Sequence, residues 1–340
     1  MKQSEDQPPI VVVVGVGVTG ARVADLLAAT LAPMQAPRIG VVDISSDVAM
    51  RVARGVAGVV IELNDAMSAD IVVLSQPAPH AEIAQRLVSN GVSVVSMSDD
   101  LDDVRSMLKL DHRARVNDAT LVVGAATAPG LSGLLARHLA SKLDSVDEVH
   151  VAMHGTGGPA CARQHHLALG GTSLGYHDGV WVQRPAGAGR ELCWFPEPVN
   201  SYDCYRAEMA DPLLLHRVFP EAGRLSARMS ATRRDRLTAR LPMLRPPHKE
   251  GGLGALRVEV RGALVDGARE TLIAGAAVRS GFAAAVVAAT MTRWVLLESP
   301  KRGLVLLGDS ALPNGALLTS VQVAGVRLFE YTGVARSLHS

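Results

Sequence analysis

The sequence of 340 residues contains little of what marks several classes of protein. Its three cysteines are Cys161, Cys193 and Cys204, with no CxxC spacing, so neither a disulfide framework nor a structural zinc site is expected. The formal net charge is +1, which gives no general attraction for nucleic acid or for an anionic membrane. Aromatic residues make up only 3% of the chain, so a local group of them is informative.

Targeting and membrane signals are also missing. The N-terminal segment MKQSEDQPP lacks the basic region and the small-residue cleavage site of a secretory signal. No apolar run reaches about 18 residues without a charge, which argues against a transmembrane helix. We therefore expect a cytoplasmic protein that acts on a small-molecule substrate and has no nucleic-acid or membrane partner.

The first 127 residues alternate short apolar runs with segments of helical periodicity. The apolar runs cover residues 10–14, 38–43, 57–62, 69–75, 92–97 and 119–124. This alternation is typical of βαβ units, in which strands buried on both faces read as continuous apolar runs. The pattern predicts an α/β fold with a Rossmann-type doubly wound parallel sheet in residues 1–127.

The pattern changes after residue 130. Further strands are expected at 146–155, 224–230, 256–265 and 268–278, and helices at 131–143 and 281–297. Long strands with partial alternation are typical of an antiparallel sheet with one covered face. We predict a second α+β domain, residues 128–280, on a mainly antiparallel sheet, and a C-terminal helix and tail, 281–340, that return to the first domain. The uncovered face of the second sheet predicts a homodimer.

The segment from Gly15 to Gly20, GVGVTG, carries the main functional signal. It follows an apolar strand and opens a helix, the context in which GxGxxG binds a dinucleotide. Gly15 permits the tight turn, Gly17 lets the backbone approach a pyrophosphate, and Gly20 allows close packing of helix and strand. The first helical residues, Val18 and Thr19, offer free N–H groups to the phosphates. The alternative is a glycine turn that binds no ligand.

Other residues are expected to complete the cofactor site. Asp43 ends the next strand and is predicted to accept hydrogen bonds from the adenosine ribose, which favours NAD over NADP although NADP stays possible. Ser45 can contact a phosphate. Ser75, Gln76 and Pro77 end the fourth strand, so they are predicted to border the nicotinamide half. The alternative for this loop is a simple strand-to-helix turn.

Four segments resemble the saccharopine dehydrogenase-like family of NAD(P)-binding reductases. They are GVGVTG (15–20), SQPAPHAEIAQRLVSNGVSVVSMSDD (75–100), ATAPGLSGLLARHLA (126–140) and VDEVHVAMHGTGGPA (146–160). The resemblance covers residues 10–170. It implies that a Pro-Gly turn at Pro129 and Gly130 joins the two domains. The family includes enzymes that act on amino-acid-derived imines and secondary amines, but this chain departs from their substrate signatures, so the substrate is not carried over.

Residues 154–166, HGTGGPACARQHH, are dense in groups for proton transfer and anion binding. His154, His165 and His166 are candidate general acids or bases, and Arg163 is a candidate carboxylate clamp. Gly157 lets this loop approach a substrate closely. The alternative is a set of surface or structural histidines. His165 and His166 are adjacent and point apart, so no metal site is predicted, and spacing fixes no base for Cys161 as a nucleophile.

A second cluster lies in residues 193–208. Tyr202, Tyr205 and Arg206 are candidate substrate-binding residues, and the alternative is a small core patch. The leading interpretation is an NAD(P)-dependent oxidoreductase that transfers a hydride to or from a small, carboxylate-bearing substrate at a C–N or C–O centre. Two alternatives stay open: a non-catalytic NAD(P)-binding regulatory or scaffold protein, and a lyase or synthase that uses tightly bound NAD.

Overall fold

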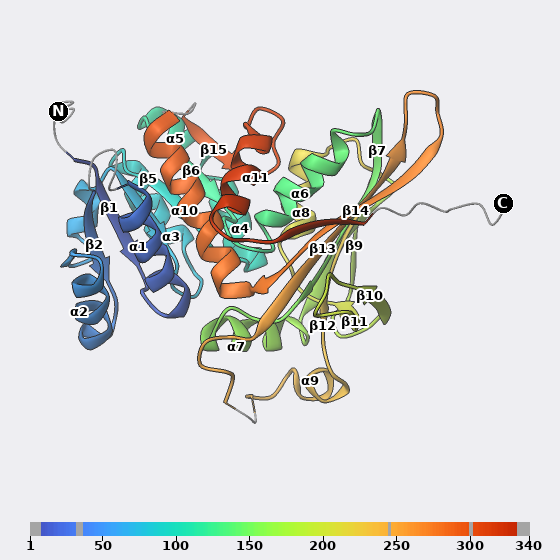
Figure 1. Ribbon diagram of the computed structural model, residues 1–340, viewed down its shortest axis with the longest axis horizontal. Coiled ribbons are helices and arrows are strands. Elements are labelled where there is room, and N and C mark those ends of the chain that lie inside the picture. The colour runs from blue at the N-terminus through green and yellow to red at the C-terminus, as the bar shows by residue number, and fades with distance from the viewer. Residues whose placement is uncertain (1–7, 32–36, 244–245, 299–301, 332–340) are drawn as a thin grey trace.

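The computed structural model describes residues 8–31, 37–243, 246–298 and 302–331. Figure 1 shows two sheets side by side, the first with its flanking helices and the second with longer strands. The fold is α/β, as predicted: a parallel sheet of seven strands and a second, mixed sheet of nine.

The first sheet has the strand order β15-β6-β5-β4-β1-β2-β3, and every described pair in it is parallel. Its strands are β1 (Ile10–Val14), β2 (Arg38–Val42), β3 (Val59–Val60), β4 (Ile71–Leu74), β5 (Ser93–Ser96), β6 (Thr120–Val123) and β15 (Gly303–Leu306). The order reverses between β1 and β4, which is the switch point where doubly wound sheets bind ligands. The side chains of Val11, Val12 and Val13 are fully buried, which explains the continuous apolar run of β1.

Helices connect these strands. They are α1 (Val18–Leu31), α2 (Ser46–Gly55), the 3₁₀ helix η1 (Asp65–Ser68), α3 (Ala81–Ser89), α4 (Leu101–Leu108) and α5 (Asp111–Val116). Ser45 caps α2, and Asp100 caps α4 by accepting hydrogen bonds from the N–H groups of Asp102 and Asp103. The segment from residue 101 to residue 116 forms two helices, because the chain turns at Lys109 and Leu110.

The second sheet has the order β10-β11-β12-β7-β13-β14-β16, with β8 on β12 and β9 on β8. Its strands are β7 (Ser145–His154), β8 (Thr172–His177), β9 (Val180–Pro185), β10 (Glu191–Trp194), β11 (Ser201–Arg206), β12 (Arg224–Ser230), β13 (Leu253–Ala263), β14 (Arg269–Arg279) and β16 (Leu328–Tyr331). Among the described pairs, only β12 with β7 is parallel, so the sheet is mainly antiparallel, as predicted.

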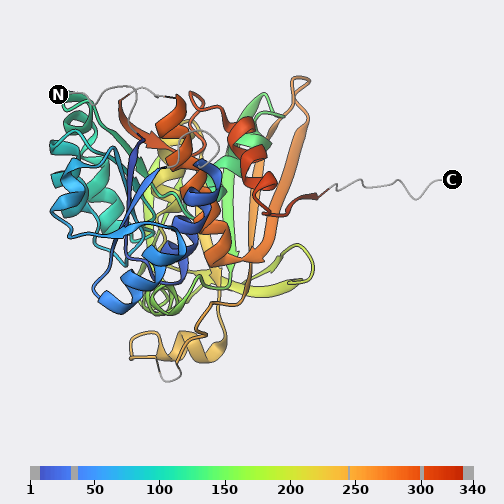
Figure 2. The same ribbon diagram turned by 60° about the vertical axis from the view of Figure 1, so that its left-hand side comes forward.

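Helices of the second half are α6 (Leu131–Ala140), α7 (Pro159–Ala168), α8 (Asp211–Val218), α9 (Arg233–Thr238), α10 (Ser280–Glu298) and α11 (Asn314–Val323). The short helix α9 lies at one end of the molecule (Figure 2), where its Arg236 packs over the ring of Tyr205 on β11. Helix α6 packs on β13 and β7, where Val149, Val151 and Val258 face the core.

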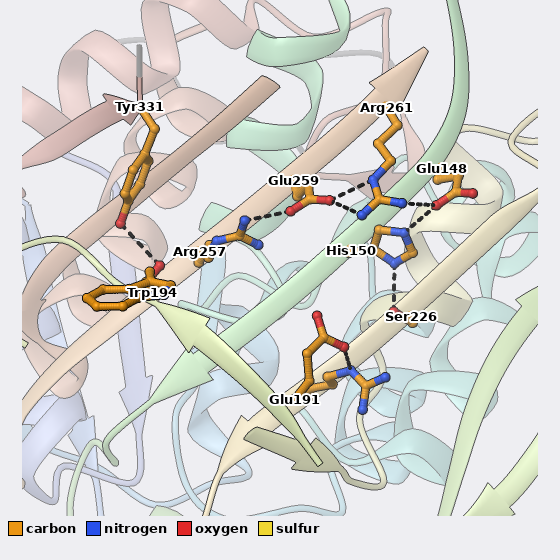
Figure 3. Close-up of polar contacts among 10 residues, drawn as sticks. Glu148, His150, Glu191, Trp194, Ser226, Arg257, Glu259, Arg261 and Tyr331 are labelled. Atoms are coloured by element: carbon orange, nitrogen blue, oxygen red, sulfur yellow. Dashed lines mark hydrogen bonds and ion pairs between the residues drawn. The ribbon is translucent and has the colours of Figure 1, made fainter. Parts of the chain in front are cut away.

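The opposite face of the second sheet carries ion pairs (Figure 3). Glu259 is buried between Arg257 and Arg261, and Arg261 also pairs with Glu148. Burial opposes the charge on Glu259, but the two arginines outweigh it and hold the pKa of this carboxyl below its usual value. His150 completes the row, because its ring nitrogens lie 2.8 Å from Glu148 and from Ser226.

The C-terminal segment connects both sheets. Helix α10 lies against α1, and β15 then adds to the first sheet beside β6. After α11, however, β16 pairs with β14 of the second sheet, so the tail returns to the first domain only in part. By length and composition α10 is apolar enough to cross a membrane, but 61% of its apolar window is buried inside the fold. Burial against α1 and α6 accounts for its apolar character.

Candidate functional site

The turn between β1 and α1 has the geometry that the glycine motif predicts. Gly15 has a φ of +84°, and a Cβ there would lie 2.4 Å from the backbone nitrogen of Gln76. A Cβ at Gly20 would lie 2.1 Å from the carbonyl oxygen of Gly15 and 2.5 Å from Oγ of Ser75. A Cβ at Gly17 would meet nothing within 4 Å. Gly15 and Gly20 are therefore required for packing, whereas the space beside Gly17 is open.

Asp43 lies beside this turn. Its Oδ2 accepts the backbone N–H of Val16 at 2.8 Å, and its Oδ1 accepts the N–H of Ser45 at 2.9 Å. The next residue, Ile44, has a fully exposed side chain. The structure thus places Asp43 and Ser45 next to the first turn of α1, which begins at Val18 and Thr19.

The loop after β4 forms the neighbouring wall. Ser75 donates its hydroxyl to the carbonyl oxygens of Val14 and Gly15, so it holds the two strand ends together. Both polar atoms of the Gln76 side chain are buried without a hydrogen-bond partner in the described part of the chain. Pro77 is exposed beside it. A buried amide without a partner is costly, and a bound ligand would satisfy it.

His80 fixes this loop, and sequence reasoning did not identify it. Its side chain is buried, with Nδ1 2.8 Å from Oγ of Ser96 and Nε2 2.8 Å from the carbonyl oxygen of Gln76. Its backbone N–H donates to the carboxylate of Asp103. Burial lowers the pKa of the imidazole. The ring therefore ties the loops after β4 and β5 together as a structural group.

The loop between β7 and α7 lies against the start of α1. A Cβ at Gly157 would lie 3.5 Å from Oγ1 of Thr19, and one at Gly158 would lie 3.2 Å from Cβ of Val18. This contact brings the second domain to the glycine turn. It also places Gly157 beside the predicted phosphate site, at the junction of the two domains.

A cavity of about 680 Å³ opens next to this loop. Its lining includes His154, His165, His166, Tyr202, Asp203 and Asp235. A second cavity, of about 140 Å³, lies between the loop after β5 and α7, and His165 and Asp99 line it. His165 thus faces both cavities. The volume of the larger cavity suits a small organic substrate.

His165 makes the strongest polar contacts in this region. Its Nε2 lies 3.0 Å from Oδ2 of Asp99 and 3.5 Å from Sγ of Cys161. Burial opposes the charge on the ring, but the sulfur of Cys161 and the hydrogen bond to Asp99 outweigh it and hold the pKa of His165 well above its usual value. The side chain is 12% exposed. Its Nδ1 has its nearest described polar contact, Cys161, at 4.0 Å.

The other two predicted histidines have different surroundings. His154 stacks on Tyr202 with ring centroids 3.9 Å apart, and its Nδ1 lies 2.8 Å from Oγ of Ser230. Burial lowers the pKa of His154. His166 directs Nε2 to the carbonyl oxygens of Thr238 and Leu241, at 2.9 and 3.1 Å. His165 and His166 therefore point apart, as predicted.

Besides Gly157, three residues predicted for the substrate site lie outside the cavity linings. Arg163 is exposed on α7. Tyr205 is buried beneath the guanidinium of Arg236, which lies 4.0 Å from its ring centroid. Arg206 packs against Gly189. The cavity is lined by the first three residues of β11, including Tyr202, whereas Tyr205 and Arg206 lie at the other end of the strand and pack within the second domain.

Asp99 and Asp211 are the polar groups that the sequence reasoning missed. Asp99 follows β5 at the same sheet edge as Gln76, a position that could have indicated it. Asp211 opens α8 and is buried, and Ser132 Oγ donates to its Oδ1 at 2.6 Å. Burial raises the pKa of Asp211 to about 6. No local pattern signals Asp211, because its partner lies 79 residues away.

Comparisons with known proteins give matches at the level of structure. No protein-family model matches the chain, and no curated protein matches it by sequence. Apo saccharopine dehydrogenase (L-Glu forming) from Saccharomyces cerevisiae matches with a TM-score of 0.70 and 14% identity, over 95% of this chain and 100% of that chain.

Two other solved structures match more distantly. An amine dehydrogenase from Mycobacterium smegmatis has a TM-score of 0.52 and 12% identity, over 90% of this chain and 97% of that chain. A mutant of meso-dapdh with DAP from Clostridium tetani has a TM-score of 0.51 and 12% identity, over 91% of this chain and 95% of that chain. At such identities the likeness concerns the fold. The chain has a saccharopine dehydrogenase-like fold.

Proposed function

We propose that this protein is an NAD(P)-dependent oxidoreductase that acts on a small, amino-acid-derived substrate. The observation that carries the proposal is the turn of Gly15, Gly17 and Gly20, which is closely packed on one side and open beside Gly17. Free N–H groups at the start of α1 face this opening and suit a pyrophosphate. The smaller cavity lies at this junction of the domains, and the larger one, lined by residues of the second domain, borders it at His165.

The preferred cofactor in this proposal is NAD. Asp43 places a carboxylate beside the glycine turn, and its charge repels a 2′-phosphate. Each of its oxygens already accepts one N–H, but an ionised carboxylate has about four acceptor positions, so ribose hydroxyls can still bind. Gln76, whose amide is buried without a described partner, is proposed to contact the nicotinamide half.

His165 is proposed to transfer the proton. The bound dinucleotide would supply or accept the hydride at the substrate carbon. Asp99 holds Nε2 of the ring, which leaves Nδ1 as the nitrogen for proton exchange with the substrate nitrogen or oxygen. His154 and Tyr202, which stack on each other, are proposed to form the wall of the substrate site.

The lining of the larger cavity favours an amine or imine over a carbonyl or alcohol. Asp203 and Asp235 face it, and a carboxylate stabilises a cationic nitrogen. Among its described lining residues there is no arginine or lysine, so a substrate carboxylate would be bound by histidines and hydroxyl groups. The fold also occurs in a protein named amine dehydrogenase, which agrees with this choice.

Turnover assays test the proposal. The purified protein is incubated with NAD⁺ or NADP⁺ and a panel of primary amines, amino acids and secondary amines, and formation of the reduced nicotinamide is followed by its near-ultraviolet absorbance. The proposal predicts reduction with at least one amine, faster with NAD⁺. Dinucleotide binding without turnover on the whole panel, in either direction, would instead indicate a non-catalytic NAD(P)-binding protein. Product formation without net change in NADH would indicate a lyase or synthase.

A further inference from the structure

The side chains of Asp99, Cys161 and His165 meet at the junction of the two domains. Asp99 comes from the loop after β5, whereas Cys161 and His165 lie one turn apart on α7. Their ligand atoms, a carboxylate oxygen, Sγ and an imidazole nitrogen, all lie within 4.8 Å of one another. Among the described residues, this is the cluster of histidine, cysteine and carboxylate side chains that could hold a metal ion.

We propose that Asp99, Cys161 and His165 form a three-ligand site for a zinc-class divalent cation. A thiolate and an imidazole select zinc or cobalt over magnesium and calcium, which prefer oxygen ligands. Two ligands at positions i and i+4 of a helix share one face, the spacing that helical zinc motifs use. No sequence pattern indicates this site, because Asp99 is more than 60 residues from the other two ligands.

The distances agree with tetrahedral coordination. With Zn–S of about 2.3 Å and Zn–N of about 2.05 Å, tetrahedral ligands would place sulfur and nitrogen about 3.6 Å apart. The observed distance between Sγ of Cys161 and Nε2 of His165 is 3.5 Å. Nitrogen and oxygen should lie about 3.3 Å apart, and Nε2 and Oδ2 of Asp99 lie 3.0 Å apart. These two ligand pairs are therefore already close to tetrahedral spacing, and all three ligand atoms lie within 4.8 Å of one another.

Surrounding groups hold the ligands in place. The side-chain amide of Gln164 donates to Oδ1 of Asp99 at 2.6 Å, which leaves Oδ2 for the metal. The N–H of Gly157 donates to Sγ of Cys161 at 3.3 Å. Such supporting hydrogen bonds orient ligands in metal sites. Asp99 and His165 also line the smaller cavity, so a fourth ligand, water or substrate, can enter from that side.

Cobalt is the probe for this site, because it replaces zinc and reports its ligands by absorption. The full-length protein, without cofactor or substrate, is titrated with Co²⁺. The proposal predicts d–d bands of a four-coordinate ion and a thiolate-to-cobalt charge-transfer band, both displaced by Zn²⁺. Cys161→Ser should lose the charge-transfer band, and Asp99→Asn should weaken Co²⁺ binding at least about tenfold.

A matched control is Cys193→Ser, because Cys193 is a buried thiol on the second sheet. It should keep both bands. Absence of a charge-transfer band in the folded wild-type protein, or an unchanged band in Cys161→Ser, would overturn the proposal. If Cys161→Ser does not fold, the Co²⁺ affinity of Asp99→Asn is the deciding measurement. An affinity equal to that of the wild-type protein would contradict the proposed site. Because dinucleotide is absent, the result is independent of the proposed oxidoreductase activity. His165 can act either as a metal ligand or in proton transfer, so the two proposals assign alternative roles to this side chain.

Discussion

The carboxylate of Asp43 accepts the backbone N–H of Val16 at 2.8 Å, which joins the end of β2 to the glycine turn after β1. The acidic group is therefore positioned before any ligand arrives. Its second oxygen accepts the N–H of Ser45. The fold itself therefore fixes the orientation of this carboxylate.

Substituting Asp43 should change cofactor preference. Asp43→Asn removes the charge but keeps an acceptor oxygen, so the repulsion of a 2′-phosphate falls and the ribose contact weakens. We expect the ratio of Kd for NADP to Kd for NAD to fall about tenfold or more, equal to about 1.4 kcal/mol. Calorimetry with both dinucleotides measures it. An unchanged ratio would reject the role of Asp43 in choosing the cofactor.

Gly17→Leu should abolish dinucleotide binding and leave the fold intact, because a Cβ there would meet nothing within 4 Å and the side chain would extend into the proposed phosphate position. Gly55→Leu is the matched control, since a Cβ at Gly55, at the end of α2, also meets nothing within 4 Å. Fluorescence titration with NADH measures binding, and circular dichroism checks the fold. Equal affinities of the two variants would show that the phosphate site lies elsewhere.

Gly20→Ala should destabilise the protein rather than only block the cofactor. The new Cβ would lie 2.1 Å from the carbonyl oxygen of Gly15, so α1 must move away from β1. Overpacking of this kind costs about 3 kcal/mol of unfolding free energy. Denaturant unfolding of the variant against wild type measures this loss, with Gly55→Ala as a control that should change stability little. A loss below about 0.5 kcal/mol would contradict the close packing.

Stability should depend on pH through Asp211. Burial raises the pKa of this carboxyl from 3.8 to about 6, so the folded protein favours the neutral acid. The stabilisation is complete below pH 3.8 and is lost as pH rises through 6. At about 1.4 kcal/mol per pKa unit, the loss amounts to about 3 kcal/mol.

Asp211→Asn tests this dependence. The amide oxygen of asparagine can still accept the hydroxyl of Ser132, and the side chain carries no charge at any pH. We expect the variant to gain stability relative to wild type as pH rises between about 4 and 6, as measured by urea unfolding at several pH values. A constant difference between the two proteins over this range would contradict the raised pKa.

His165→Asn should lower kcat by about 100-fold or more, since general acid or base catalysis contributes on that scale. Dinucleotide affinity should change little, because His165 lies on α7 and not at the glycine turn. His177→Asn is the matched control: His177 is an exposed histidine that pairs with Asp178 at 3.0 Å on the second domain. Equal turnover by the two variants would assign the proton transfer to another group.

The sequence predicted the parts of the fold that local patterns determine. The run of valines in β1 indicates a buried parallel strand, because burial on both faces selects apolar β-branched residues. The glycine motif likewise indicated a close-packed turn. The identity of these residues could be read from the local pattern, although the turn itself packs against Ser75 and Gln76 of a distant loop.

Features that depend on distant pairing were not predictable. The strand β16 joins the second sheet through β14, and β12 lies parallel to β7. Neither segment has a sequence pattern that identifies the strand with which it pairs. In the site, His165 was a candidate, but Asp99 was not, because only the fold brings the loop after β5 to α7. Similarly, nothing local shows that Arg163 faces solvent.

Isothermal titration of the purified protein with NAD, NADH, NADP and NADPH tests the central claim most directly. The account predicts heat of binding with saturation at one dinucleotide per chain, tighter for NAD or NADH than for the phosphorylated forms. No heat with any of the four, confirmed at a second temperature, would contradict the proposal that the turn at Gly15, Gly17 and Gly20 binds a pyrophosphate.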